Sequence, residues 1–349
     1  MLIVRKNIQI PLSPEVIPIG PKIAFLKQKD NYPHPVKNLT FKETQFAWLF
    51  LTDKLIYKLK KAVKNALIDM STRELRLKNC MEELRLNQRL SRNIYHGVVP
   101  LRLDAKGKLT FKGDAQIVDW LVQAKRIDET NTLQYAILHN TLNKGDLFRT
   151  AAFLIEFYKK AEPVMFDPSV FFERLKKSIE TTYAELINPV YALPASLIQT
   201  LSSAMLIYME GHKSLFLDRA DKGKIIEVHG DLKPENICMG ADSAIINCME
   251  LNKDQRIMDM VEELSFLTME CESIGNNSVG EVFFNTYTSL TADYPDESLI
   301  NFYKLKSAFK RAHSVACEMQ ESALDTDPGW NGKATRYLQL AEQYYQKLY

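Results

Sequence analysis

The stretch HGDLKPEN, residues 229–236, most constrains what this chain of 349 residues can fold into. It is polar and rich in turn-forming residues, and it lies between the apolar runs 224–228 and 237–239. We expect the two runs to be strands and the octapeptide to be the loop that joins them. The loop carries an aspartate, Asp231, and shortly after it an asparagine, Asn236.

This pair of residues suits phosphoryl transfer. Such a transfer needs little covalent work from the protein, but it needs an acceptor hydroxyl held in line and cations that neutralise the phosphates. Asp231 can accept the proton of the hydroxyl, and Asn236 can offer an amide oxygen to magnesium without adding charge. An aspartate and an asparagine at this spacing often form only a turn, but the position between two apolar strands favours the functional interpretation.

The first third of the chain is rich in predicted strands. The six prolines before residue 36 indicate an extended or irregular lead-in of about forty residues. Gln45–Val63 reads as a β-hairpin, and the predicted short strands that follow are 98–103, 109–112 and 117–122.

Helical patterns make up most of the rest. Residues 71–90 alternate leucines with charges in a helical pattern, and Ser71 with Glu74 forms a capping box. From about Thr130 the pattern is helical except for 223–252, where a second hairpin, 237–239 with 244–249, follows the loop. The expected fold is therefore α+β with two lobes, a β-rich one at 1–125 and a helical one at 126–349.

The composition narrows the function classes. Basic and acidic residues nearly balance, 45 against 43, so the charge gives no reason to expect a nucleic-acid or membrane partner. The five cysteines are widely spaced, the first twenty residues are not a convincing signal peptide, and no apolar run reaches membrane-spanning length. We expect a soluble cytoplasmic protein.

Several segments, in this order and spacing, resemble the bacterial aminoglycoside-phosphotransferase-like family, which has a protein-kinase-like fold. The resemblance begins near residue 25 and spans nearly the whole chain. It is carried by YPHPV (32–36), IYKLKKAV (56–63), EELRLNQRL (82–90), IYHGVVPL (94–101), GKIIEVHGDLKPENI (223–237), NCMELN (247–252) and MDMVEELSFL (258–267). The resemblance implies an ATP-dependent phosphotransferase that uses Mg²⁺ and acts on a hydroxyl of a small-molecule acceptor.

In the catalytic loop, the resemblance assigns roles residue by residue. It makes Asp231 the catalytic base and Asn236 a metal ligand. Lys233 resembles the loop lysine that contacts the transferred phosphate in protein kinases, although a solvated loop lysine is an equal alternative.

In the first lobe, the resemblance implies a phosphate-binding lysine on the strand YKLK. Lys58 and Lys60 point to the same face of that strand, so the sequence does not choose between them, and we favour Lys58. The glutamate expected to pair with this lysine is Glu83, with Glu82 as the alternative. Trp120 falls where the resemblance expects the lobe hinge and could stack on adenine, or it could be a core residue.

Two departures from the family pattern stand out. Residues 41–56 contain no glycine, so no glycine-rich loop covers the phosphates. Asn247 stands where the family usually has the aspartate that binds magnesium, and magnesium prefers carboxylate ligands. Glu250 and Asp259 are acidic residues nearby in sequence that could substitute, but the family already has acidic residues at both positions.

The sequence therefore leaves two hypotheses. The first is an ATP-dependent phosphotransferase slowed by Asn247. The second is a pseudokinase, which would bind nucleotide or act as a scaffold without catalysis. The acidic residues of 254–272 could bind a cationic acceptor, or they could simply form a solvated helix face.

Overall fold

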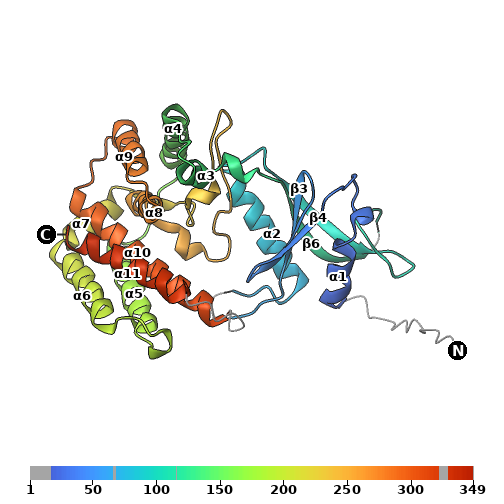
Figure 1. The fold of residues 1–349 in the computed structure, drawn as a ribbon, viewed down its shortest axis with the longest axis horizontal. Helices are drawn as coiled ribbons and strands as arrows, with labels where there is room; N and C mark the ends of the chain where they lie inside the picture. Colours follow the sequence, from blue (N-terminus) through green and yellow to red (C-terminus); the bar gives the residue numbers. More distant parts are fainter. Residues whose placement is uncertain (1–16, 66–67, 115, 322–328, 349) are drawn as a thin grey trace. The chain divides into compact units, whose positions relative to one another are not determined.

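The computed structural model describes residues 17–65, 68–114, 116–321 and 329–348 (Figure 1). Residues 1–16 of the proline-rich lead-in lie outside the described residues. By its contacts the chain forms two compact units. The first is the chain up to Ile127 together with Glu250–Asn252, and the second consists of Asp128–Met249 and the chain from Lys253 onward. The expected α+β class is confirmed, with an antiparallel sheet in the first unit and mostly helices in the second.

The first unit is built on a six-stranded sheet in the order β1-β2-β3-β6-β4-β5, in which every neighbouring pair is antiparallel. The hairpin expected at 45–63 is present as β2 and β3, and Thr52 closes its turn by hydrogen bonds to Leu55. The sequence missed the edge strand β1. The strands are β1 (Thr40–Glu43), β2 (Ala47–Leu51), β3 (Leu55–Lys60), β4 (Tyr95–Leu103), β5 (Leu109–Thr110) and β6 (Gln116–Lys125).

Helix α1 (Ile19–Leu26) corrects the prediction of an irregular lead-in. Pro18 caps the helix and Pro21 lies in its first turn, where a missing N–H removes no helical hydrogen bond. Leu26 then packs with Tyr57 and Leu59 of β3 in the core of this unit. A short 3₁₀ turn, Lys29–Asn31, follows. Prolines at the start of a segment are thus compatible with a helix.

Helix α2 (Arg73–Gln88) is present as predicted, but its cap and its buried face differ from the prediction. Thr72, not Ser71, caps it by accepting from the Leu75 N–H, because Ser71 bonds instead to Asp69. The buried face includes polar as well as apolar side chains. Its residues are Arg76, Cys80, Glu83, Leu86 and Asn87.

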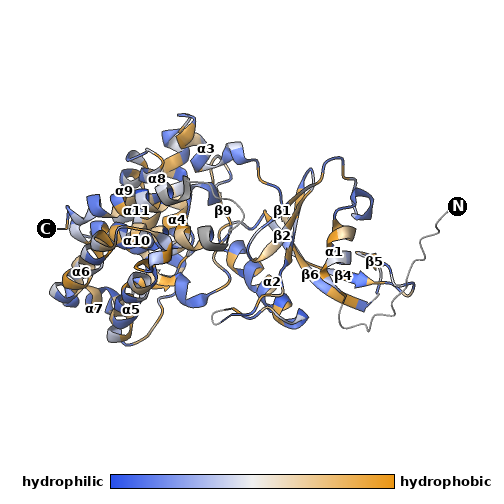
Figure 2. Cartoon of the chain, turned by 60° about the horizontal axis from the view of Figure 1, so that its bottom comes forward, coloured by the Kyte–Doolittle hydropathy of each residue, from blue (hydrophilic) through white to orange (hydrophobic). Residues whose placement is uncertain are grey.

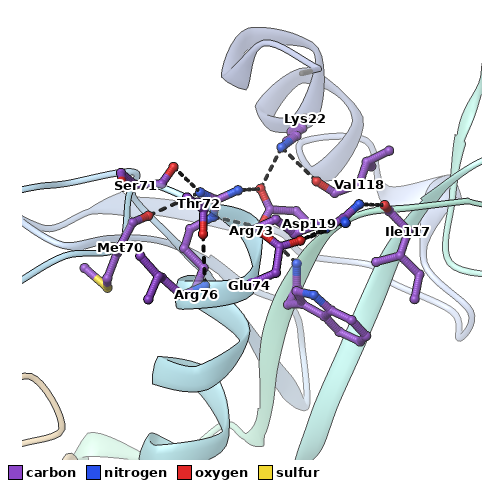
Figure 3. A network of polar contacts seen from close by, with 12 residues as sticks. Lys22, Met70, Ser71, Thr72, Arg73, Glu74, Arg76, Ile117, Val118 and Asp119 are labelled. Carbon is purple, nitrogen blue, oxygen red and sulfur yellow. Dashed lines mark hydrogen bonds and ion pairs between the residues drawn. The ribbon is translucent and has the colours of Figure 1, made fainter. Parts of the chain in front are cut away.

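A buried ionic network fixes α1 and α2 to strand β6 (Figure 3). Asp119 of β6 accepts two hydrogen bonds from Arg76 of α2, both at 2.9 Å, and one from Lys22 of α1 at 2.6 Å. All three side chains are nearly inaccessible to solvent. A single carboxylate therefore joins three elements of the first unit.

The second unit is helical around two short pairs of strands. In Figure 2 its helices carry both hydrophobic and hydrophilic residues, as expected for helices with one buried face. Its helices are α3 (Leu133–Leu138), α4 (Lys144–Lys160), α5 (Pro168–Leu186), α6 (Ala195–Gly211), α7 (Lys213–Asp221), α8 (Met260–Ser273), α9 (Ser278–Thr291), α10 (Glu297–Glu321) and α11 (Gly329–Tyr345). Short 3₁₀ turns lie at Glu129–Asn131, Pro189–Tyr191, Pro234–Asn236 and Lys253–Arg256.

The strands of the second unit border the loop that the sequence singles out. Strand β7 (Ile225–Glu227) pairs with β10 (Ile257–Asp259), and β8 (Ile237–Cys238) pairs with β9 (Ala244–Ile245). The strand before the loop and the hairpin after it are confirmed, although β9 ends at Ile245 rather than Met249. The sequence missed β10. No helix in the described part of the chain has both the length and the apolar character needed to cross a bilayer.

We predict that Asp119→Ala destabilises the protein strongly. The substitution leaves the buried ammonium of Lys22 and the guanidinium of Arg76 without their carboxylate, and breaking a buried ion pair costs about 3–5 kcal/mol. Glu74→Ala is the matched control, because it breaks the solvent-exposed ion pair with Arg73. Urea unfolding should show a lower midpoint for Asp119→Ala alone. Equal midpoints in the two variants would contradict a structural role for this network.

Candidate functional site

The loop 229–236 is held by hydrogen bonds to its own backbone. The carbonyl of Asp231 accepts from the Lys233 N–H and from the side-chain amide of Asn236, both at 2.9 Å. Pro234 then begins a 3₁₀ turn, Pro234–Asn236, that leads into β8. Asp231, Pro234 and Asn236 thus belong to one compact turn, as the sequence predicts.

His229 supports the loop from inside the protein, where it is fully buried. Its Nε2 lies 2.8 Å from the carbonyl of Ile246, and the Asp231 N–H points at its Nδ1 at 3.3 Å. A ring nitrogen that faces a carbonyl carries a proton, and one that faces an N–H does not. His229 is therefore a neutral imidazole that links the loop 229–236 to the segment after β9.

Glu263 of α8 is the functional residue that sequence reasoning missed. Its buried carboxylate accepts the Gly230 N–H at 2.6 Å and the His229 N–H at 3.3 Å. The hydroxyl of Tyr158 donates to it as well, at 2.7 Å. These hydrogen bonds hold the N–H groups of His229 and Gly230 in one orientation. Glu263 therefore fixes the backbone direction immediately before Asp231.

Gly230 is the one residue of the loop whose backbone requires glycine. Its φ of 85° lies in the left-handed region, and a Cβ there would lie 3.0 Å from Cγ of Arg256 and 3.1 Å from Cβ of Met249. A side chain at this position would therefore collide with two neighbouring residues.

Asp231 and Lys233 present their charged ends to solvent. Their side chains are 25% and 21% exposed, and the Lys233 ammonium lies 3.0 Å from the Asp231 carboxylate. Leu232 and Pro234, between and beside them, are buried. The loop therefore exposes one carboxylate and one ammonium on a fixed backbone.

Asn236 and Asn247 bind each other. Because Nδ2 of Asn236 donates to the carbonyl of Asp231, its Oδ1 faces Asn247, whose Nδ2 donates to it at 3.0 Å. The backbone of Asn247 is left-handed, with a φ of 59°, a conformation that asparagine and aspartate tolerate better than most residues. The structure thus brings the two predicted metal ligands together.

These two amides do not by themselves fit a resident magnesium ion. Neither carries a charge, and the oxygen of Asn236 is occupied by the amide of Asn247. In the described ranges, no group of three or more His, Cys, Asp or Glu side chains is suited to hold a metal. A magnesium ion at this position would need further, negatively charged oxygen ligands.

Glu250 and Asp259, the two acidic residues that could replace an aspartate at position 247, both form ion pairs with other residues. Glu250 belongs to the first unit, where it binds Lys60 at 2.5 Å. Asp259 is fully buried, caps α8 through the Val261 N–H, and pairs with Arg219. Neither carboxylate stands in for the missing aspartate.

In the first unit, Lys58 and Lys60 of β3 both contact Glu83 of α2, at 2.6 and 2.5 Å. Lys60 also binds Glu250, so it lies between two carboxylates. Burial alone would raise the pKa of Glu83, but the two ammonium groups more than offset it and hold the pKa below its usual value. Burial would likewise lower the pKa of both lysines, and the carboxylates of Glu83 and Glu250 raise it instead.

Exposure distinguishes the two lysines that the sequence could not separate. The Lys60 side chain is 1% exposed and has both of its carboxylates as fixed partners, whereas the Lys58 side chain is 20% exposed. Lys60 is therefore suited to a structural role and Lys58 to contact with a ligand. Glu82, the alternative to Glu83, pairs with Arg85 on the helix surface.

Trp120 does not lie at the hinge that the resemblance suggested. It is half-buried within β6, where it pairs with Pro100 of β4, and the two units divide after Ile127. A tryptophan within a β-sheet packs against neighbouring strands, so its position gives no support to the predicted contact with adenine.

The acidic residues of 254–272 are neither a solvated face nor a site for a cation, apart from the exposed Asp254. The others are mostly buried, and each has a partner. Asp259 pairs with Arg219, Glu262 with Lys306, Glu263 with the loop N–H groups, Glu270 with Arg311, and Glu272 with Lys304.

We predict that Lys60→Met destabilises the protein more than Lys58→Met. Without Lys60, Glu250 loses its ammonium partner and buried Glu83 keeps one of two, at a cost of about 3–5 kcal/mol. Without Lys58, Glu83 still binds Lys60. Thermal unfolding of both variants checks the order. The reverse order would make Lys58 the structural lysine.

Comparison with known proteins adds sequence relatives of unknown activity. No family model matches the chain. Uncharacterised proteins of Mycobacterium tuberculosis (strain ATCC 25618 / H37Rv) and Mycobacterium bovis (strain ATCC BAA-935 / AF2122/97) are each 26% identical to it over 319 residues, or 90% of this chain. The chain spans 61% of the length of these relatives.

Solved structures resemble the chain over nearly its whole length. Choline kinase from Cryptosporidium parvum aligns with a TM-score of 0.55 and 12% identity, covering 94% of this chain and 96% of that one. The choline kinase LicA from Streptococcus pneumoniae gives 0.52 and 18%, covering 94% and 98%. A thermostable mutant of aminoglycoside phosphotransferase APH(4)-Ia gives 0.55 and 10%, covering 93% and 98%. The chain therefore has the protein-kinase-like fold of choline kinases and aminoglycoside phosphotransferases, as its motifs predict.

Proposed function

We propose that this protein is a phosphotransferase that moves the γ-phosphate of ATP to a hydroxyl of a small molecule. One observation carries the proposal. The loop around Asp231 is fixed from inside by Glu263 and His229, yet it exposes the Asp231 carboxylate. A buried network that holds an exposed carboxylate is what general base catalysis requires and what a simple turn does not need.

The proposed reaction is one in-line displacement. Asp231 accepts the proton of the acceptor hydroxyl as the hydroxyl oxygen forms a bond to the γ-phosphorus. The bond between that phosphorus and the β,γ-bridging oxygen breaks, and ADP leaves. Lys233, which contacts Asp231, can neutralise charge on the transferred group.

Nucleotide binding is assigned to the first unit, and acceptor binding to the second. Lys58 is the phosphate-binding lysine in this proposal, because it is the more exposed of the two lysines and its ammonium is positioned by Glu83 at 2.6 Å. The choline kinase LicA, whose fold this chain shares, has been solved in complex with AMP. ATP would enter as MgATP, so that the metal arrives with the phosphates.

A second candidate, a nucleotide-binding protein without catalysis, rests on the hydrogen bond between Asn236 and Asn247. An aspartate cannot donate to Asn236, so this contact exists only because residue 247 is an asparagine. The bond joins the loop and the following segment without a metal ion. It favours a protein that has kept its shape and given up metal-assisted transfer.

Asp231→Asn should abolish phosphotransfer and leave nucleotide affinity nearly unchanged. The amide keeps the shape of the side chain but cannot take a proton, and loss of a general base lowers the rate roughly 10²–10⁴-fold. The measurement is ADP formation from ATP with a mixture of hydroxyl compounds, beside calorimetric titration with ATP. ADP formation at the wild-type rate would end the assignment of Asp231, and a wild type that binds ATP but never forms ADP would favour the second candidate.

Asn247→Asp should make ATP binding more dependent on magnesium. The substitution removes the donor to Asn236 and sets a carboxylate oxygen against an amide oxygen, an arrangement that a cation between them relieves. With magnesium, ATP should bind roughly tenfold or more tightly than to the wild type. With a chelator it should bind no better, or worse, because the new charge repels the phosphates.

Paired ATP titrations of wild type and Asn247→Asp, with magnesium and with a chelator, measure this effect. Magnesium dependence that is equal in both proteins would mean that residue 247 does not face the metal of MgATP.

A further inference from the structure

Helix α8 fastens both the catalytic loop and helix α10 through two adjacent residues. Glu263 binds the N–H of Gly230, one residue before Asp231, at 2.6 Å. Glu262 binds the ammonium of Lys306 of α10 at 2.6 Å. Helix α10 packs along α8, and Lys306 joins the two helices. One turn further along α10 is Lys310.

Lys310 differs from the neighbouring cations because no carboxylate forms an ion pair with it in the described part of the chain. Glu262 compensates Lys306, Glu270 compensates Arg311 at 2.6 Å, and Asp231 compensates Lys233. The Lys310 side chain is exposed, and among the described residues its ammonium has no hydrogen-bond or ion-pair partner.

The charges that act on Lys310 come from the loop and from both helices. The surrounding protein and the nearby ammonium of Lys306 hold the pKa of Lys310 below its usual range, and the carboxylates of Glu262 and Asp231 act against them. Asp231 also acts on the guanidinium of Arg311. His313, the next residue of this face, contacts Glu185, and burial lowers its pKa, so it adds no charge near neutral pH. An exposed ammonium beside another cation gains from an incoming anion.

We propose that Lys310 binds an anionic group, a carboxylate or a phosphate, on the acceptor whose hydroxyl faces Asp231. This inference deepens the proposed function and rests on it. The carboxylates of α8 are paired inside the protein, so they offer nothing to a quaternary ammonium or to an amino sugar. The preferred substrate class is therefore a hydroxy acid or a phosphorylated alcohol rather than a cationic alcohol.

The test compares acceptors that differ only in charge. D-glycerate and glycerol 3-phosphate are the anionic probes, glycerol is the neutral one, and choline is the cationic one. ADP formation and calorimetric binding are measured for each probe at constant ionic strength. The proteins are wild type, Lys310→Gln, Lys310→Arg and, as a control, Lys160→Gln, which removes an exposed lysine of α4.

Lys310→Gln should raise the KM or the Kd of an anionic probe roughly 10- to 100-fold, the loss expected for one charge-assisted hydrogen bond. It should leave glycerol unaffected and kcat nearly unchanged. Lys310→Arg should keep most of the affinity, and Lys160→Gln all of it. A merely structural lysine would change all probes alike.

Two outcomes overturn the inference. One is choline as the best acceptor, with no effect of Lys310→Gln. The other is the absence of any Lys310-dependent binding of either anion. The proposed function fails separately. If the anions bind through Lys310 but no ADP forms in an Asp231-dependent way, the anion site stands and phosphotransfer is wrong. If ADP forms with a neutral or cationic acceptor independently of Lys310, only the anion site is wrong.

Discussion

The bond between the Glu263 carboxylate and the N–H groups of His229 and Gly230 is the interaction on which the rest of the second unit's site depends. A carboxylate buried in a protein is costly unless its oxygens are satisfied, and here two backbone donors and the Tyr158 hydroxyl satisfy them. If the loop moved away from α8, the buried carboxylate of Glu263 would lose its backbone donors, which is energetically costly. Asp231 is thus presented by a backbone with little freedom, which lowers the cost of reaching a reactive geometry.

The same principle organises the first unit and helix α8. Asp119 joins α1, α2 and β6, and Glu83 joins α2 to both lysines of β3. In each case a buried carboxylate has more than one cationic partner or several donors. Buried ion pairs of this kind contribute little net stability relative to apolar packing, but they specify one arrangement. Among the described cations near Asp231, Lys233, Lys306 and Arg311 each have a carboxylate partner, and the exposed Lys310 has none.

Local features of the chain could be predicted from the sequence, and features that depend on distant partners could not. HGDLKPEN could be read as a loop because Gly, Pro and Asp act on their own backbone, and the β2–β3 hairpin could be read because strand and turn residues are adjacent. Glu263 could not be found, because 34 residues separate it from His229 and a glutamate in a helix is ordinarily a surface residue. The signal in the sequence is that Glu263 stands in the mostly apolar stretch MDMVEELSFL, residues 258–267.

Other errors have similar physical causes. Alternation places Lys58 and Lys60 on the same face, and only the tertiary contact of Lys60 with Glu250 separates them. Prolines were read as breaking structure throughout the lead-in, whereas Pro18 and Pro21 occupy the start of α1, where proline is tolerated. Trp120 falls where the resemblance expects a hinge, but strand β6 continues past it.

The central claim is that the buried network around Glu263 serves the chemistry of Asp231. Glu263→Gln tests it most directly, through the rate of ADP formation from ATP with the same mixture of hydroxyl compounds, measured beside ATP affinity on folded protein. Glutamine keeps the shape but has one acceptor oxygen where two are needed for the two N–H groups. The account predicts a rate at least tenfold lower with ATP affinity unchanged. An unchanged rate in the folded variant would contradict it.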